Sequence, residues 1–427
     1  MVVVLGAHQA RADPKRDKPD YDGRGNPDAD AETWVRWIPR VLLWPPYAVN
    51  EYVLRRPIGA LVTIADRHHW VGAFAGDATH ESRTHVVPIA RFDHGELPAV
   101  GAEISLARAW RDDDTAYAGA TTWGTREYAA AARDRVTYDR GAGSIELRAG
   151  YARAVDNAFF GIGPAARARD ASRFGLARGG AGFDYARRLE PGLALSLESG
   201  VEHVAFVGGA CCDEPSLADQ VARGTLPAPP GYGDPYTFAH ERAELAIGDR
   251  AAAGEGGGPW LHVYGDARSR LDRSATWLRY GARAGAAIDL DGHHRVLAVL
   301  AGVDLVDPLQ ADAVAFTELA SPADELMPAF IPGWMLGRSA AAAQLAYSWP
   351  IWVVLDARVR FALGNAFDAH FADFALGALR ASADFSIVVN ASHAHPIELV
   401  IGAGSDPLDD GVHVAAVRVV VGTRRAL

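Results

Sequence analysis

The sequence contains few of the features that mark a helical membrane protein or a typical soluble enzyme. No stretch approaches the roughly 18 consecutive apolar residues that a membrane-spanning helix needs, although 49% of the residues are hydrophobic. Methionine occurs only 3 times, and the only lysines are Lys15 and Lys18. Apolar residues therefore alternate with polar ones, as in a strand with two different faces. The 44 glycines fit a β protein with many turns, either a membrane barrel or a soluble sandwich.

Charge and cysteine content exclude several classes of function. The net charge of -11 argues against nucleic acid as a partner, because that affinity comes mainly from cations that contact phosphate. Cys211 and Cys212 are adjacent and no second cysteine pair exists, so we predict no zinc site. They are either two loop thiols or a vicinal disulfide formed in an oxidising compartment. Adjacent histidines at 68–69 and 293–294 do not converge easily on one metal, so we predict no metal and no cofactor.

Strand after strand follows from Pro57 onward. Residues 145–151, 278–286 and 353–361 alternate with a period of two, which places successive side chains on opposite faces. One face is apolar, and the other mixes charged residues with glycine and alanine, as in the wet interior of a barrel. The charges predicted to face the lumen are Glu146, Arg148, Arg279, Arg283, Asp356, Arg358 and Arg360.

The connections between these strands alternate in length. Residues 139–143, 289–292 and 409–411 read as tight turns, and Asp-Gly is a strong hairpin signal. Residues 208–234 and 307–332 read as long, irregular loops. Outer-membrane barrels show this alternation, and a strand with its share of connection takes roughly 20–25 residues. We therefore predict an all-β protein, a closed antiparallel transmembrane β-barrel of about sixteen strands.

Residues 1–56 differ from the rest of the chain in composition and lack the alternating pattern. Residues 1–12 include an apolar stretch and an Ala-Arg-Ala sequence before Asp13, so we predict the remnant of a signal peptide. Residues 13–56 begin polar and end in a proline-broken segment with three tryptophans, which predicts a short N-terminal helical segment. This amphipathic segment is either a plug in the lumen or a membrane-interface segment, or a helix packed on a soluble core. The barrel is predicted to occupy residues 57–427.

Three stretches resemble the BamA/TamA family of outer-membrane proteins, also called the bacterial surface antigen family. Residues 156–164 read Asp-Asn-Ala-Phe-Phe-Gly-Ile-Gly-Pro, similar to a signature that precedes one of that family's strands. Residues 344–352 resemble the strand after the loop that folds into the family's barrel, and residues 361–367 resemble a strand end. The resemblance assigns the family signature to Asn157, Phe160, Gly161 and Gly163.

The resemblance implies a sixteen-stranded barrel with a loop folded into its lumen. That loop carries an Arg-Gly-Phe motif in the family, whereas residues 327–330 here read Met-Pro-Ala-Phe, so only the phenylalanine is shared. The candidate residues of the lumen loop are Phe330, Gly333 and Arg338. Family members usually carry POTRA domains before the barrel, and the residues before Pro57 are too few for one, which points to a branch without them.

The family resemblance implies a role in outer-membrane assembly or in the transport of proteins or lipids. We expect a monomer, integral to the bacterial outer membrane, with membrane lipid and a client protein or lipid as partners and no enzymatic activity. One alternative is a passive porin or solute channel. A second is an outer-membrane lipid hydrolase that uses Asn390, Ser392 and His393, although adjacent strand residues point to opposite faces and these residues also fit a turn.

Overall fold

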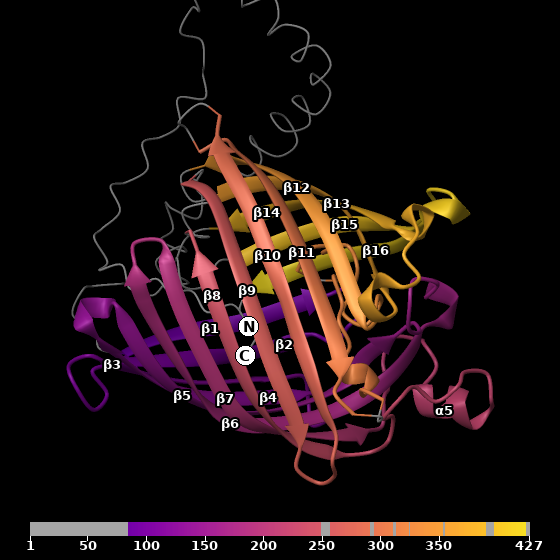
Figure 1. Ribbon diagram of the computed structural model, residues 1–427, viewed down its shortest axis with the longest axis horizontal. Coiled ribbons are helices and arrows are strands. Elements are labelled where there is room, and N and C mark those ends of the chain that lie inside the picture. The colour runs from indigo at the N-terminus through magenta and orange to yellow at the C-terminus, as the bar shows by residue number, and fades with distance from the viewer. Residues whose placement is uncertain are drawn as a thin grey trace, which may run out of the picture.

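Sixteen antiparallel strands close on themselves in the computed structural model (Figure 1). The structure describes residues 84–248, 257–290, 294–310, 313–323, 325–352, 355–389 and 397–423. Each strand pairs with its neighbours in the sequence, and β1 pairs with β16 to complete the ring. The predicted all-β class, the closed antiparallel barrel and the strand count are confirmed.

The strands all lie between Thr84 and Thr423. In chain order they are β1 (Thr84–Asp93), β2 (Ala99–Ala107), β3 (Asp114–Thr122), β4 (Tyr128–Tyr138), β5 (Gly143–Phe159), β6 (Ser172–Glu190), β7 (Leu193–Val207), β8 (Tyr236–Ile247), β9 (Gly257–Arg270), β10 (Thr276–Asp289), β11 (Val296–Pro308), β12 (Ser339–Trp352), β13 (Leu355–Phe367), β14 (Arg380–Val389), β15 (Ile397–Pro407) and β16 (Val414–Thr423). The predicted signal remnant, the polar segment, the helical plug and the first residues of the predicted barrel lie outside the described residues.

The connections differ between the two ends of the barrel. At one end β4 joins β5 through the 3-10 turn η2 (Asp139–Gly141), and two residues join β6 to β7. The opposite end carries the long connections: β7 to β8, with helix α5 (Leu217–Ala222), and β11 to β12, with η4 (Phe316–Glu318). The remaining 3-10 turns are η3 (Ala168–Asp170), η5 (Ala369–Phe371), η6 (Leu376–Ala378) and η7 (Leu408–Asp410). Among the described residues, no helix is long and apolar enough to span a bilayer.

The two faces of each strand differ in character. On β5, Leu147 is 60% exposed on the outer wall while the next residue back, Glu146, is buried inside. On β13, Phe361 is 56% exposed outside while Arg360 is buried inside. This alternation follows from the pleat of the strand, which turns successive side chains to opposite faces. The barrel thus has an apolar outer wall and a charged inner wall.

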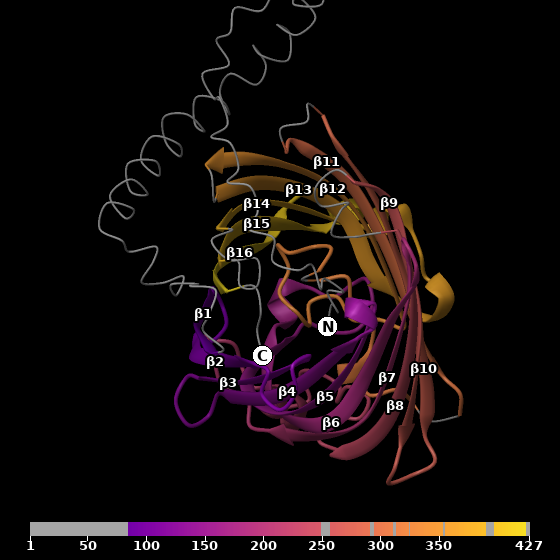
Figure 2. The same cartoon turned by 90° about the vertical axis from the view of Figure 1, so that its left-hand side faces the viewer.

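The main apolar core lies inside the barrel, toward the end with the long connections. The connection between β11 and β12 folds back within the ring of strands (Figure 2) and packs against wall residues such as Phe238, Trp277 and Val306. Its own contribution includes Phe316 and Phe330, both fully buried. Burial of one such side chain stabilises the fold by roughly 1.5–3 kcal/mol. This apolar packing holds the connection in the lumen.

Candidate functional site

Two neighbouring features make up the candidate site. The first is the lumen loop, residues 309–338, which connects β11 to β12 inside the barrel. The second is the seam, the junction of β1 with β16 that closes the ring. The lumen loop contacts the wall at a buried charge, at an aromatic cluster and at the seam itself.

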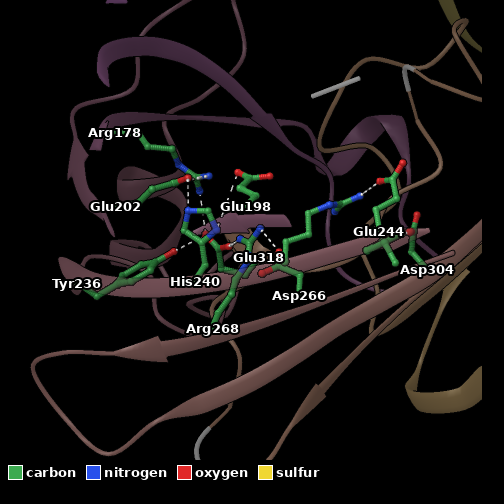
Figure 3. Close-up of polar contacts among 12 residues, drawn as sticks. Arg178, Glu198, Glu202, Tyr236, His240, Glu244, Asp266, Arg268, Asp304 and Glu318 are labelled. Atoms are coloured by element: carbon green, nitrogen blue, oxygen red, sulfur yellow. Dashed lines mark hydrogen bonds and ion pairs between the residues drawn. The ribbon is translucent and has the colours of Figure 1, made fainter. Parts of the chain in front are cut away.

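The buried charge is Glu318 at the end of η4 in the lumen loop. Its carboxylate is 1% exposed and accepts hydrogen bonds from the Tyr236 hydroxyl at 2.7 Å and from Arg178 at 2.8 Å. Arg268 forms a further ion pair with its other oxygen (Figure 3). Burial alone would raise the pKa of Glu318, but the two guanidinium groups hold that pKa below its ordinary value. A carboxylate buried this deeply is stable only because both arginines pair with it.

Ion pairs continue from Glu318 along the inner wall of β6 to β9. Arg268 also contacts Asp266 at 2.7 Å, and Arg178 lies 3.5 Å from Glu202. Figure 3 shows these side chains, together with His240, pointing toward one another from neighbouring strands. The Glu318 carboxylate of the lumen loop is therefore bound by two arginines of the barrel wall, Arg178 and Arg268.

An aromatic cluster joins the lumen loop to the predicted family signature. The ring of Phe160, just after β5, stacks on Trp334 of the lumen loop at a centroid distance of 4.0 Å. Trp334 also meets Phe330 edge to face at 5.4 Å. The backbone N–H of Gly163 donates to the Leu336 carbonyl at 2.7 Å. Gly333 has φ of +89°, and a Cβ there would overlap the Ala158 carbonyl oxygen.

The other signature residues shape the turn that makes these contacts. Asn157 lies where the pairing of β5 with β6 shifts register, and its amide donates to the Ala154 carbonyl at 3.3 Å. Gly161 has φ of +111°, a conformation that favours glycine. The turn then reaches across the barrel, where its Pro164 carbonyl accepts from Asn365 of β13 at 3.3 Å. Arg380 of β14 binds the carbonyls of both Pro164 and Ala166.

The seam is the thinnest junction in the barrel. Among the described residues, three residue pairs, at Arg91, Phe92 and Asp93, join β1 to β16, and the backbone N–H of His94 donates to the Val419 carbonyl at 2.9 Å. Neighbouring strands elsewhere pair over eight residues, as for β1 with β2, up to fifteen, as for β5 with β6. Within the described residues, positions 84–90 of β1 have a strand partner on the β2 side alone. A short ladder of this kind holds the ring with few backbone hydrogen bonds.

A buried arginine spans the seam and also reaches the lumen loop. Arg418 of β16 is 2% exposed, and its guanidinium pairs with the carboxylate of Asp93 on β1 at 2.6 Å. The same group donates to the carbonyls of Pro328 and Phe330, each at 3.1 Å. Sequence analysis missed this residue, because 325 positions separate Arg418 from Asp93.

Arg338, one of the three candidate residues of the lumen loop, lies at the base of that loop. It pairs with Asp307 at the end of β11 at 2.8 Å and donates to the Val306 carbonyl. The cation at the tip of the lumen loop is instead Arg418, which comes from the barrel wall.

The predicted lumen-facing charges are spread around the inner wall. Glu146 pairs with Arg135 at 2.6 Å, Arg148 with Asp184 at 3.1 Å, Arg283 with Asp304 at 2.6 Å and Arg360 with Asp384 at 2.6 Å. Arg279 adds to the positive charge around Glu318. Asp356 and Arg358 share the inner face of β13 with Arg360, as alternate residues of one strand. The wall thus carries mixed charge and no single binding centre.

Three other features considered in the sequence are the cysteine pair, the hydrolase residues and possible metal sites. The structure joins Cys211 and Cys212 in a disulfide. Residues 390–396, which include Asn390, Ser392 and His393 of the hydrolase alternative, lie outside the described residues. In the part of the chain that the structure describes, no three His, Cys, Asp or Glu side chains are grouped so as to hold a metal ion.

Known proteins resemble this chain in structure and not in sequence. No family model and no curated protein matches the sequence. BamA from Haemophilus ducreyi, in a structure lacking POTRA domains 1–3, superposes with a TM-score of 0.57 at 13% identity, over 80% of this chain and 70% of that one. CdiB from Acinetobacter baumannii superposes with a TM-score of 0.50 at 7% identity, over 80% of this chain and 60% of CdiB. The predicted resemblance is therefore confirmed at the level of the fold: the chain is a sixteen-strand barrel of the BamA and CdiB type.

Proposed function

We propose that this protein is an integral outer-membrane barrel that assists outer-membrane assembly, or moves proteins or lipids, through its seam. The observation that carries the proposal is that, within the described residues, three pairs join β1 to β16 whereas every other pair of neighbouring strands is joined by eight or more. A junction with few backbone hydrogen bonds costs least to separate. Opening it would connect the lumen with the surrounding membrane.

The outer wall supports a position within the membrane. Large apolar side chains are exposed on strands all around the barrel, and examples are Ile104, Leu147, Phe183, Val201, Val263, Val299, Leu345, Phe361 and Ile401. A soluble monomer rarely exposes contiguous apolar surface on this scale. A closed sheet satisfies its own backbone hydrogen bonds, which makes it one of the two structures that can span lipid. The likeness to BamA and CdiB favours the outer membrane in particular.

The filled lumen argues against the porin alternative. A passive channel needs an open path, whereas the lumen loop brings Phe316, Met327 and Phe330 into the barrel in fully buried positions. We therefore expect the intact protein to show little steady conductance in planar bilayers. A large steady conductance would favour the porin and count against the proposal.

A disulfide across the seam tests the proposal directly. Phe92 and Val421 face each other on β1 and β16, so Phe92→Cys with Val421→Cys should lock the seam. Cys211→Ser and Cys212→Ser belong in the background, because the native pair would otherwise exchange with the new one. The matched control is Ile401→Cys with Val419→Cys, a facing pair on β15 and β16, which pair over nine residues.

The readout is complementation of a deletion strain of the source organism. Outer-membrane proteins, surface lipids and secreted proteins are quantified in membrane and medium fractions. We expect the deletion to lower a subset of them, and both the wild type and the oxidised control to restore it. The seam-locked protein should restore that subset only after reduction. Full restoration by the oxidised, seam-locked protein would overturn the proposal.

A further inference from the structure

We infer that Arg418 couples the closure of the seam to the seating of the lumen loop, so that each is weakened when the other is released. This deepens the proposed function, because it states how opening of the seam would be controlled. The inference rests on one buried side chain that touches three separate elements: β16, β1 and the tip of the lumen loop.

All the bonds that make this link come from a single guanidinium group. Its Nη2 and Nε contact the Asp93 carboxylate at 2.6 and 3.1 Å, which ties β16 to β1. Its Nη1 donates to the carbonyls of Pro328 and Phe330 at 3.1 Å each, which ties β16 to the loop tip. Arg418 and Asp93 are 2% and 1% exposed, so water does not replace a lost partner without rearrangement.

The loop tip is otherwise seated on the β15 side of the seam. Gly402 and Gly404 of β15 leave the space that the tip occupies. A Cβ at Gly402 would lie 2.9 Å from the Ala329 Cβ, and one at Gly404 would overlap the Phe330 ring. The tip therefore rests against β15, next to β16, and Arg418 connects it to β1.

Separation of the seam would leave the two charges in unequal positions. Asp93 would keep Arg91, its neighbour on β1, whose guanidinium lies 2.9 Å away. Arg418 would lose the Asp93 carboxylate, and removal of one partner from a buried ion pair is strongly disfavoured. Departure of the loop tip would in turn remove two acceptors from Arg418 and leave two carbonyls unpaired. A guanidinium that has lost either set of partners must move to reach water, and this movement breaks its contacts with the other set. Each separation is thus easier after the other has occurred, and such a coupling is reciprocal.

The first experiment uses the purified full-length protein with the seam locked by Phe92→Cys and Val421→Cys. Hydrogen exchange is measured for the backbone amides of residues 325–337, before and after oxidation. We expect the lock to slow exchange at the loop tip at least about fivefold, the lower end of typical couplings between sites. The control lock at Ile401 and Val419 should leave that exchange unchanged. Unchanged exchange in the seam-locked protein would overturn the inference, whatever the variants below do.

The second experiment assigns the coupling to Arg418. Arg418→Lys keeps the positive charge but replaces the planar, forked guanidinium, whose separate nitrogens contact Asp93 and the loop carbonyls, with one compact ammonium group that does not reproduce this geometry. It should speed exchange at the loop tip and abolish the effect of the seam lock. Arg360→Lys is the matched control, because Arg360 forms an equally short, buried pair with Asp384 between β13 and β14. If Arg418→Lys behaves like Arg360→Lys, Arg418 is not the link.

Asp93→Asn provides a second variant with the same expectation, in case Arg418→Lys does not assemble. It removes the charge on the β1 side of the seam and leaves the side chain almost the same size. Faster exchange at the loop tip, whose carbonyls accept hydrogen bonds from Arg418, is the expected sign of coupling. These measurements need no client. A seam-locked protein that still complements the deletion would refute the proposed function alone, whereas a loop tip insensitive to the lock would refute the coupling alone.

Discussion

At the scale of single residues, the charge on the lumen loop depends on two wall arginines. Glu318→Gln should loosen the loop, because a neutral amide cannot balance the charges of the Arg178 and Arg268 guanidinium groups that pair with the buried carboxylate. Removal of one partner from a buried pair costs roughly 3–5 kcal/mol. We expect a lower temperature for the mobility shift of the heated protein on gels and faster proteolysis of the loop.

The matched control is Glu325→Gln on the same loop. Glu325 is 42% exposed and contacts Arg283 at 3.5 Å, so its exposed ion pair contributes only about 0–1 kcal/mol. If both variants lowered the temperature of the mobility shift equally, burial of the Glu318 charge would add nothing to the stability of the loop.

A second residue-scale prediction concerns pH. Burial, together with the nearby Asp156 charge, raises the pKa of Glu127 in the β3–β4 turn to about 7 from an ordinary 4.5. The folded state therefore holds this proton more tightly than the unfolded state does. Stability should fall as pH rises from about 4.5 to 7 and then level off. Glu127→Gln should flatten this dependence when heat unfolding is measured between pH 5 and 8, whereas Asp112→Asn in an exposed turn should preserve it.

At the scale of elements, the strands could be predicted from the sequence and the lumen loop largely could not. Alternation with a period of two marks strands such as β5, β10 and β13 within their own few residues, because the pleat alone sets it. The loop obeys no such period. Glu318 has its partners on β6, β8 and β9, and Arg418 of the last strand pairs with Asp93 of the first strand. Only closure of the ring brings these charges together, so no local pattern marked either of them.

The contact of the lumen loop with β5 gives a prediction about that element. Gly333→Ala places a methyl group against the Ala158 carbonyl and also forces alanine into a left-handed conformation. The conformation alone costs roughly 1–2 kcal/mol. Gly124→Ala is the control, since Gly124 has φ of +78° with open space around it. We expect the loop to become protease-sensitive only in the Gly333 variant. Equal effects would mean that the close approach to β5 is unimportant.

At the scale of the whole molecule, the apolar wall predicts how the barrel responds to a charge outside. Leu147 is 60% exposed on the outer face of β5, and Leu376 is 72% exposed in η6, beyond the strands. An arginine on the lipid face of a membrane barrel costs roughly 2–4 kcal/mol near the middle of the bilayer and almost nothing near its edge. Leu147→Arg should therefore reduce folding into vesicles, while Leu376→Arg should not. Similar folding of both variants would count against a transmembrane wall.

Residues 85–90 of β1 have no partner strand on the β16 side among the described residues, and this has a consequence for the association of copies. An unpaired strand edge is a template on which another chain can add and aggregate. Pro88 stands in the middle of residues 84–90 and has no amide hydrogen to offer a neighbouring strand. Pro88→Val should therefore increase cross-linked dimers in crowded membranes, whereas the wild type should remain monomeric. Pro88 therefore makes this edge of β1 a poor template for strand pairing with a second barrel.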